Sequence, residues 1–324
     1  MKAVTKVSGA AIVNVEYFSD KVVDAFVVHS KGSAATMKTY RNSVKRLVKW
    51  FAVKGIAQPN ENDFDAYISE LRLAGKSNST LRLYHVIGKM FFGFLAERGI
   101  YRNVTAGSKL NLHKKKSHSR KSLSLEQAKN LLASVKGDDE ISMRDRAIIA
   151  LCLQTGLRTV EIERMDVKDL GGDEGGYHLL AVQGKGETTK DRFVKVSNSV
   201  AKLIFGYWAK RGVVSDDAPA FTSTSGNRNW KKNRFGSRLS AQSVGKLIKR
   251  HMLAADIKDD RITAHSCRHF AATTAIKAGV ELREVSDMLR HSNINITLTY
   301  LHDLSEETRR AELAVADSLF GGAA

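Results

Sequence analysis

The residues best suited to chemistry in this chain are two arginines, a lysine, two histidines and a tyrosine. Fixed cations and hydrogen-bond donors neutralise the negative charge that develops on a phosphate during its transfer. A tyrosine hydroxyl becomes a nucleophile when neighbouring groups stabilise its anion. The set therefore predicts attack by a protein side chain on a phosphodiester. In chain order, the residues are Arg158, Lys185, His265, Arg268, His291 and Tyr300.

The sequence around the first two residues predicts the elements that position them. Arg158 is expected to open a short helix, in the segment Thr155-Gly156-Leu157-Arg158-Thr159-Val160-Glu161. On that helix Glu161 either orients the arginine or is an ordinary partner three residues away. Lys185 lies between two glycines, at the expected tip of a hairpin.

The spacing of the other four residues also constrains their geometry. His265 and Arg268 are three residues apart, so on one helix both face the same side and reach one phosphate. His291 and Tyr300 are nine residues apart, which would put them on opposite faces of an unbroken helix. A break is therefore expected at 292–295.

In these residues, their order and their local motifs, the chain resembles the tyrosine recombinase (phage integrase) family. The resemblance implies that Arg158 and Arg268 neutralise the phosphate, and that Lys185 gives a proton to the leaving 5′ oxygen. Lys190 is close enough in sequence to compete for that role. Lys185 is preferred because the family motif places its lysine between two such glycines.

The resemblance also assigns the histidines and the tyrosine. His265 accepts or shares the proton of the nucleophile or binds the phosphate, and His291 donates a hydrogen bond to a non-bridging oxygen. Tyr300 becomes a covalent 3′-phosphotyrosine, which retains the phosphodiester energy, so neither a nucleotide nor any other cofactor is expected, and no metal.

Two positions depart from the family pattern. Arg290 stands where the family usually has glycine before the second histidine, and Cys267 stands where a hydrophobic residue usually splits the H-x-x-R motif. Neither change removes a chemical group, so activity is expected. Arg290 is expected to add a charge beside the phosphate.

The net charge of +18 predicts a polyanionic partner, and double-stranded DNA is favoured. Basic residues are concentrated in two stretches without acids, between Glu97 and Glu126 and between Asp217 and Asp256. A solvated surface is the alternative interpretation of each stretch. The DNA-binding candidates within them are Lys114, Lys115, Lys116, Arg120, Lys231, Lys232 and Arg234.

Composition argues against several other classes of protein. Two cysteines cannot build a disulfide framework or a four-thiolate zinc site. No apolar run approaches the ~20 residues that span a bilayer, and the first residues make a poor signal peptide. The expected location is the cytoplasm, in association with the nucleoid.

The fold class predicted is mainly α, with a small β-sheet in the C-terminal catalytic domain, arranged as a two-domain DNA clamp. Three or four helices form an N-terminal helical core-binding domain, 1–105; a basic linker covers 106–122; the catalytic domain covers 123–324. Apolar spacing predicts a hairpin from Tyr177–Val182 and Arg192–Val196. It predicts helices at 36–53, 61–73, 80–98, 143–154, 157–165, 199–211, 241–255, 264–278, 282–290, 296–301 and 306–319, and a capping box at Ser124 and Gln127 begins another.

The function predicted is that of a site-specific DNA recombinase of the integrase or resolvase type. A type IB topoisomerase, which shares the phosphotyrosine chemistry, and a DNA-binding regulator with an inactive site are the alternatives. The resemblance implies dimers and tetramers on DNA, joined through the helix at 306–319, and allows for accessory DNA-bending proteins. The DNA site and the choice among integration, resolution and inversion stay open.

Overall fold

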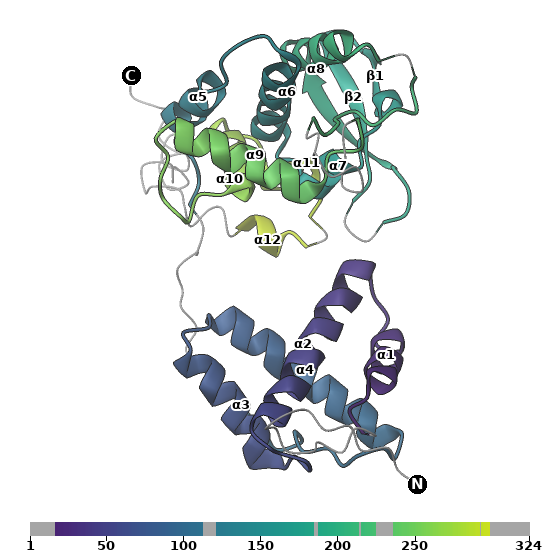
Figure 1. The fold of residues 1–324 in the computed structure, drawn as a ribbon. Coiled ribbons are helices and arrows are strands. Elements are labelled where there is room, and N and C mark those ends of the chain that lie inside the picture. The colour runs from purple at the N-terminus through teal and green to yellow at the C-terminus, as the bar shows by residue number, and fades with distance from the viewer. Residues whose placement is uncertain are drawn as a thin grey trace, which may run out of the picture. The chain divides into compact units, whose positions relative to one another are not determined.

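The chain divides into two units, Met1–Lys116 and Ser117–Ala324, each with its own hydrophobic core. The structure is a computed structural model that describes residues 17–112, 121–184, 187–213, 215–224, 236–291 and 293–298 (Figure 1). Among the described residues, no helix is both long and apolar enough to cross a bilayer.

The first unit consists of helices that begin at polar caps. They are α1 (Asp20–His29), α2 (Ala34–Val53), α3 (Glu61–Leu73) and α4 (Asn78–Glu97). The side chain of the preceding Ser19, Ser33, Asn60 or Ser77 accepts a hydrogen bond from a backbone N–H of the first turn. In Figure 1, α1 and α3 flank the pair formed by α2 and α4. Sequence reasoning allowed a fourth helix without placing it, and α1 is that helix.

An aromatic core holds the first unit together. Phe18, Phe51, Phe91 and Phe92 are buried, and the ring of Phe18 lies 6.1–6.3 Å from the other three. Large buried rings contribute most of the apolar area in such a core.

The second unit is mainly helical with a small sheet. Its helices are α5 (Leu125–Ala133), α6 (Glu140–Thr155), α7 (Thr159–Glu163), the 3₁₀ turn η1 (Val167–Asp169), α8 (Asn198–Arg211), α9 (Ala241–Ala254), α10 (Ala264–Lys277), α11 (Leu282–Leu289) and α12 (Asn295–Leu298). The predicted capping box is confirmed: the Gln127 N–H donates to Ser124 Oγ, and the Ser124 N–H donates to Gln127 Oε1, both at 3.0 Å. The mainly α fold class with a small sheet is likewise confirmed.

The sheet is antiparallel, in the order β1 (Leu170–Asp173), β2 (Tyr177–Val182), β3 (Arg192–Ser197). The predicted hairpin is confirmed, with Tyr177 opposite Ser197 and Val182 opposite Arg192. Its inner face carries Leu180, Val182, Val194 and Val196, all buried in the core that α6 and α8 share. Sequence reasoning missed β1 because two of its four residues are glycines, which are depleted in strands.

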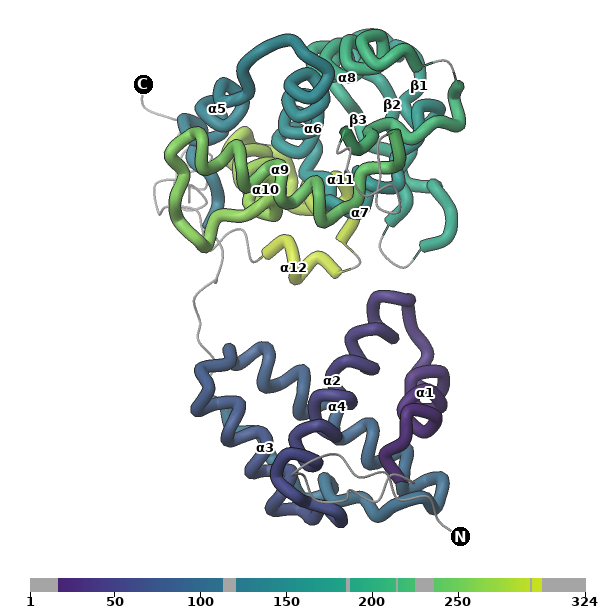
Figure 2. Tube along the Cα trace, viewed as in Figure 1, coloured from purple at the N-terminus to yellow at the C-terminus, as the bar shows by residue number. Residues whose placement is uncertain are grey.

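One predicted helix of the second unit begins later than expected, and the predicted range of another extends past the described residues. The one predicted at 157–165 is α7, which begins at Thr159 because Arg158 has extended dihedrals, φ −75 and ψ 150, as its N-cap. The one predicted at 296–301 is described only as α12, Asn295–Leu298, at the yellow end of the tube in Figure 2. The predicted helix at 306–319 lies outside the described residues.

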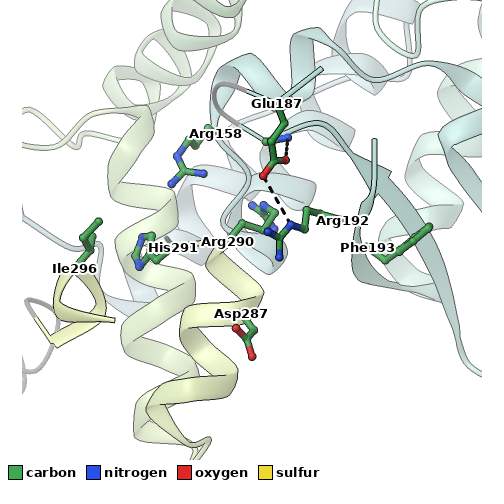
Figure 3. Close-up of a pocket in the computed structure, with 9 residues that line it drawn as sticks. Arg158, Glu187, Arg192, Phe193, Asp287, Arg290, His291 and Ile296 are labelled. Atoms are coloured by element: carbon green, nitrogen blue, oxygen red, sulfur yellow. Dashed lines mark hydrogen bonds and ion pairs between the residues drawn. The ribbon is translucent and has the colours of Figure 1, made fainter. Parts of the chain in front are cut away.

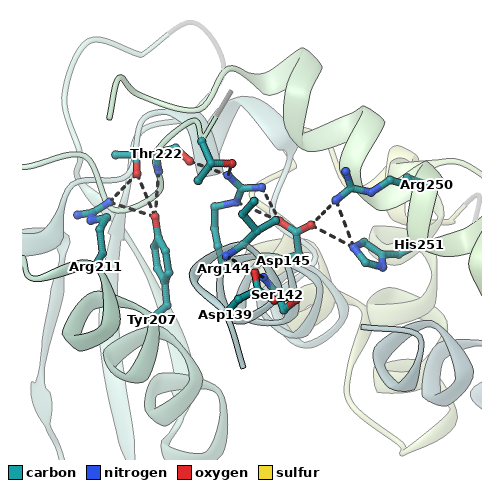
Figure 4. A network of polar contacts seen from close by, with 11 residues as sticks. Asp139, Ser142, Arg144, Asp145, Tyr207, Arg211, Thr222, Arg250 and His251 are labelled. Carbon is teal, nitrogen blue, oxygen red and sulfur yellow. Dashed lines mark hydrogen bonds and ion pairs between the residues drawn. The ribbon is translucent and has the colours of Figure 1, made fainter. Parts of the chain in front are cut away.

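A buried polar network joins α6 to α9 (Figure 4). Asp145 on α6 is 1% exposed, and its Oδ1 accepts hydrogen bonds from the guanidinium of Arg144 at 2.7 and 3.0 Å. Its Oδ2 accepts from Arg250 at 2.5 Å and lies 3.1 Å from the ring of His251, both on α9. Arg144 also donates to the carbonyl of Thr222 at 2.9 Å. One carboxylate therefore fixes the helix that leads into the Arg158 turn.

Replacing Asp145 should destabilise the protein strongly. Asp145→Ala leaves the buried guanidinium of Arg144 without its counter-charge, which costs about 3–5 kcal/mol. Urea unfolding followed by circular dichroism measures the loss. Asp138→Ala is the control, because Asp138 pairs with Arg146 while 90% exposed, and such pairs contribute little. Equal effects of the two substitutions would contradict this role of Asp145.

Candidate active site

The turn between α6 and α7 begins at a glycine that no other residue can replace without strain. Gly156 ends α6 with φ 62 and ψ 23, in the left-handed region. A Cβ added there would lie 2.7 Å from Cδ2 of Leu289. The conformation and the close approach together explain the glycine two residues before Arg158.

Arg158 is held at the N-terminus of α7 by a reciprocal pair of contacts with Glu161. The Arg158 N–H donates to Glu161 Oε2 at 2.7 Å, and its Nη1 donates to Oε1 at 2.9 Å. The Glu161 side chain is fully buried, whereas the Arg158 side chain is 25% exposed. Glu161 therefore contacts both the backbone and the guanidinium of Arg158 while leaving the guanidinium accessible, which favours the orienting role.

Arg268, on α10, contacts this turn from inside the protein and is 1% exposed. Its Nη1 donates to the carbonyl of Gly156 at 2.7 Å, and its Nη2 donates to the carbonyl of Leu289. These carbonyls precede Arg158 and His291 by two residues each. The arginine therefore ties together the two segments that carry the other candidate groups.

His291 follows α11 and is oriented by α12. Its Nδ1 lies 2.8 Å from Oγ1 of Thr297, which is fully buried. Burial lowers the pKa of His291 to about 4, and the positive charges of Arg268, Arg158 and Arg290 add to that effect. The imidazole is therefore neutral near pH 7, and when the Thr297 hydroxyl donates to Nδ1, Nε2–H can donate to an oxygen.

Two cavities meet at Arg158. The first, of about 520 Å³, is also lined by Gly184, Arg192, Arg290 and His291 (Figure 3). The second, of about 690 Å³, is lined by Arg158 and Lys249 together with His265, which is half-buried with its ring 5.3 Å from that of His269. The surface around Arg158 is rich in cations and suits an anion.

Lys190 is engaged away from these cavities. Its Nζ lies 2.6 Å from Oδ2 of Asp166 and 2.5 Å from Oδ2 of Asp169, and its side chain is 24% exposed. Moving it to a leaving group would break two ion pairs. This geometry argues against Lys190 as the proton donor.

The remaining candidates lie outside the described residues. They are Lys185 and Tyr300 of the reaction set, and Lys114, Lys115, Lys116, Arg120, Lys231, Lys232 and Arg234 of the DNA-binding set. Sequence reasoning missed Thr297, because no local pattern links a threonine to a histidine six residues before it. It also expected Arg290 to be a charge beside the phosphate. The structure buries its side chain to 4% exposure, with Nη2 2.9 Å from Oε2 of Glu161.

The sequence matches two family models in order along the chain. The model of the Phage integrase, N-terminal SAM-like domain matches residues 24–99, and that of the Phage integrase family matches residues 121–307. A tyrosine recombinase XerD of Bifidobacterium longum is 28% identical over 300 residues, which cover 89% of this chain and 94% of the relative.

Solved structures share the fold at lower identity. The XerH site-specific recombinase bound to palindromic difH substrate, in a post-cleavage complex, is similar with a TM-score of 0.68 and 20% identity, over 86% of this chain and 79% of that one. A lambda integrase dimer bound to a COC' core site gives a TM-score of 0.67 and 15% identity, over 90% of this chain and 78% of that one.

Adding a methyl group at Gly156 should destabilise the protein more than adding one at another left-handed glycine. Gly212→Ala is the matched control, since Gly212 ends α8 with φ 69 and has nothing within 4 Å of its added Cβ. That control should lose about 1–2 kcal/mol from the backbone alone. Gly156→Ala should lose about 1–3 kcal/mol more, because Leu289 must move. Urea unfolding measures both losses of stability. Equal losses would mean that Leu289 moves away from the added methyl group at no cost in free energy.

His291 should titrate well below its ordinary pKa of 6.5, near 4. Since the unfolded chain then binds this proton more tightly, its contribution to stability is complete above pH 6.5 and is lost as pH falls toward 4. A proton–nitrogen NMR titration, assigned by comparison with His291→Gln, measures the pKa directly. An imidazole that titrates near 6.5 would show that neither burial nor the three arginines lower its pKa.

Proposed function

This chain belongs to the phage integrase family. From this we propose that it is a tyrosine-type site-specific DNA recombinase, which cuts and rejoins DNA through a covalent 3′-phosphotyrosine. The observation that carries the proposal is the convergence of Arg158 and His291 on one cavity, with Arg268 buried beneath both. Relatives named tyrosine recombinases align over about nine-tenths of the chain, which supports the same activity.

The arginines would supply the electrostatic part of catalysis. The Arg158 fork is accessible and permanently charged, so it suits two non-bridging oxygens of the scissile phosphate. Arg268 adds positive potential from below, and its bonds to two carbonyls keep both loops in place before DNA arrives. Donors fixed in advance stabilise the transition state without reorganising. His291, being neutral, contributes a hydrogen bond to the phosphate without a charge.

The covalent step exchanges one phosphodiester for another. Oη of Tyr300 attacks phosphorus, its proton passes to His265, and the bond to the 5′ oxygen breaks. Lys185 protonates that oxygen, which leaves as a hydroxyl. A 5′ hydroxyl from a second strand then reverses the step. Since bond energy is conserved throughout, the reaction needs no nucleotide and no cofactor.

The rest of the chain would hold the DNA. We assign 1–105 to a helical DNA-binding domain, 106–122 to a basic linker and 123–324 to the catalytic domain, closing on the duplex as a clamp. The net charge of +18 supports contacts to the phosphate backbone. These contacts are assigned to Lys114, Lys115, Lys116, Arg120, Lys231, Lys232 and Arg234.

Assembly on DNA is part of the proposal. The similar lambda integrase structure is a dimer bound to a core site, which supports paired protomers here. The predicted helix at 306–319 would dock on the next protomer, and such head-to-tail contacts can close into rings. Four protomers on two sites, with or without accessory DNA-bending proteins, would complete the reaction on nucleoid DNA in the cytoplasm.

The test is the covalent adduct. Tyr300→Phe should abolish the protein–DNA adduct on a suicide substrate while leaving DNA binding nearly unchanged, because phenylalanine lacks the attacking oxygen. Gel electrophoresis under denaturing conditions detects the adduct, and gel shift measures binding. Tyr177→Phe is the control, since Tyr177 lies on β2 against Lys195 and should keep full adduct formation. An adduct that persists in Tyr300→Phe would assign the nucleophile elsewhere.

A further inference from the structure

An arginine occupies a backbone position that favours glycine. Arg290 follows the last residue of α11 with φ 56 and ψ 47, in the left-handed region. A residue with a Cβ there costs roughly 1–2 kcal/mol relative to ordinary helical dihedrals. Such a cost persists where the surrounding structure compensates for it, so the contacts of this side chain need an explanation.

The side chain of Arg290 is used entirely inside the protein. Its Nη2 donates to Glu161 Oε2 at 2.9 Å, and its Nη1 donates to the carbonyl of Met288 at 2.6 Å. The side chain is 4% exposed and that of Glu161 is fully buried. A buried carboxylate strongly requires such partners. Arg290 thus links α11, which leads to His291, with α7, which follows Arg158.

Glu161 is shared between two arginines. Its two oxygens accept the backbone N–H and Nη1 of Arg158 on one side and the guanidinium of Arg290 on the other. Burial raises the pKa of Glu161, but Arg290 and the bonds from Arg158 outweigh it and hold the carboxyl below its ordinary value. The carboxylate is therefore charged and doubly held.

This sharing changes the charge that Arg158 offers. With Arg290 present, two positive groups surround one negative group, and the cluster keeps a net positive charge beside the cavity. Without Arg290, the charge of Arg158 would be cancelled by Glu161, and its fork would be drawn toward that carboxylate. Asp287, Glu187 and Arg192 also line this cavity. Among the described residues, none of these three has a hydrogen bond to Glu161, whereas Arg290 does.

We propose that Arg290 is a positioning residue for DNA cleavage: by neutralising and holding Glu161, it keeps the guanidinium of Arg158 directed at the phosphate. The inference rests on the proposed function, since cleavage is the step that Arg158 serves. Among the described residues, the hydrogen bonds of the Arg290 side chain go to Glu161 and to the carbonyl of Met288, so the role assigned to it is to hold another residue in place.

The first measurement is the rate of adduct formation at saturating DNA. Arg290→Met should lower this rate about tenfold to a hundredfold, because small displacements of a catalytic group have effects of that size, while DNA affinity changes less than about twofold. Arg290→Lys should restore part of the rate by returning the charge. Arg283→Met, an exposed arginine of the same helix, is the control and should match wild type. If Arg290→Met folds poorly, Arg290→Gly replaces it in the test, because glycine adopts the left-handed dihedrals at this position without strain.

The second measurement asks whether Arg290 acts through Glu161. If it does, the Arg290→Met and Glu161→Gln double variant should be no slower than Glu161→Gln alone. Additive losses, or a weakened affinity with a salt slope lowered by about 0.9, would mean that Arg290 contacts DNA itself and would overturn the proposal. A wild-type rate in Arg290→Met would overturn it as well.

A third readout needs no activity. The Nε–H resonance of Arg158 in a nitrogen-15 NMR spectrum should shift in Arg290→Met and stay in place in Arg283→Met. An unmoved resonance would overturn the positioning role. If wild type forms no adduct while this resonance shifts, the proposed function fails and the link from Arg290 to Arg158 stands.

Discussion

The buried guanidinium of Arg268 is the interaction on which the arrangement of the site depends. It is 1% exposed and donates to the carbonyls of Gly156 and Leu289. A buried charge must be hydrogen-bonded to be tolerated, so the two loops that supply these carbonyls cannot separate cheaply. Arg158 follows one loop and His291 follows the other. A side chain from a third element, α10, therefore helps to set their separation, together with the Arg290–Glu161 pair.

A second constraint is electrostatic. Arg158, Arg268 and Arg290 lie close enough to His291 to add to the lowering of its pKa by burial, and Glu161 offsets part of their charge. Arginines held close together form a positively charged site that suits a phosphate. Burial and this positive charge together lower the pKa of the imidazole and keep it neutral, which suits it to donate a hydrogen bond. The arginines that preorganise the site therefore also help burial to keep the histidine neutral.

Ion pairs and core packing around the site hold these positively charged side chains close together despite their mutual repulsion. Asp145 fixes α6 against α9, and α9 carries Lys249 to the second cavity. The inner face of β2 and β3 packs on α6 and α8 and holds the hairpin that leads toward Gly184. Lys190, in the connection between β2 and β3, is held by ion pairs with Asp166 and Asp169. The helices therefore hold Lys249 in place, and the ion pairs beside the sheet hold Lys190 in place.

The sequence by itself determined the local elements and the chemistry. Helical spacing, the Ser124 capping box and the hairpin all follow from residues within a few positions of each other, and the order of six side chains indicated phosphoryl transfer. Only the tertiary structure decided that Arg290 is buried on Glu161, that Lys190 is paired with carboxylates, and that Arg268 binds two loop carbonyls. These contacts join residues 21 to 129 positions apart. No local pattern records such distances, because they are set by how the helices and the sheet pack around a common core.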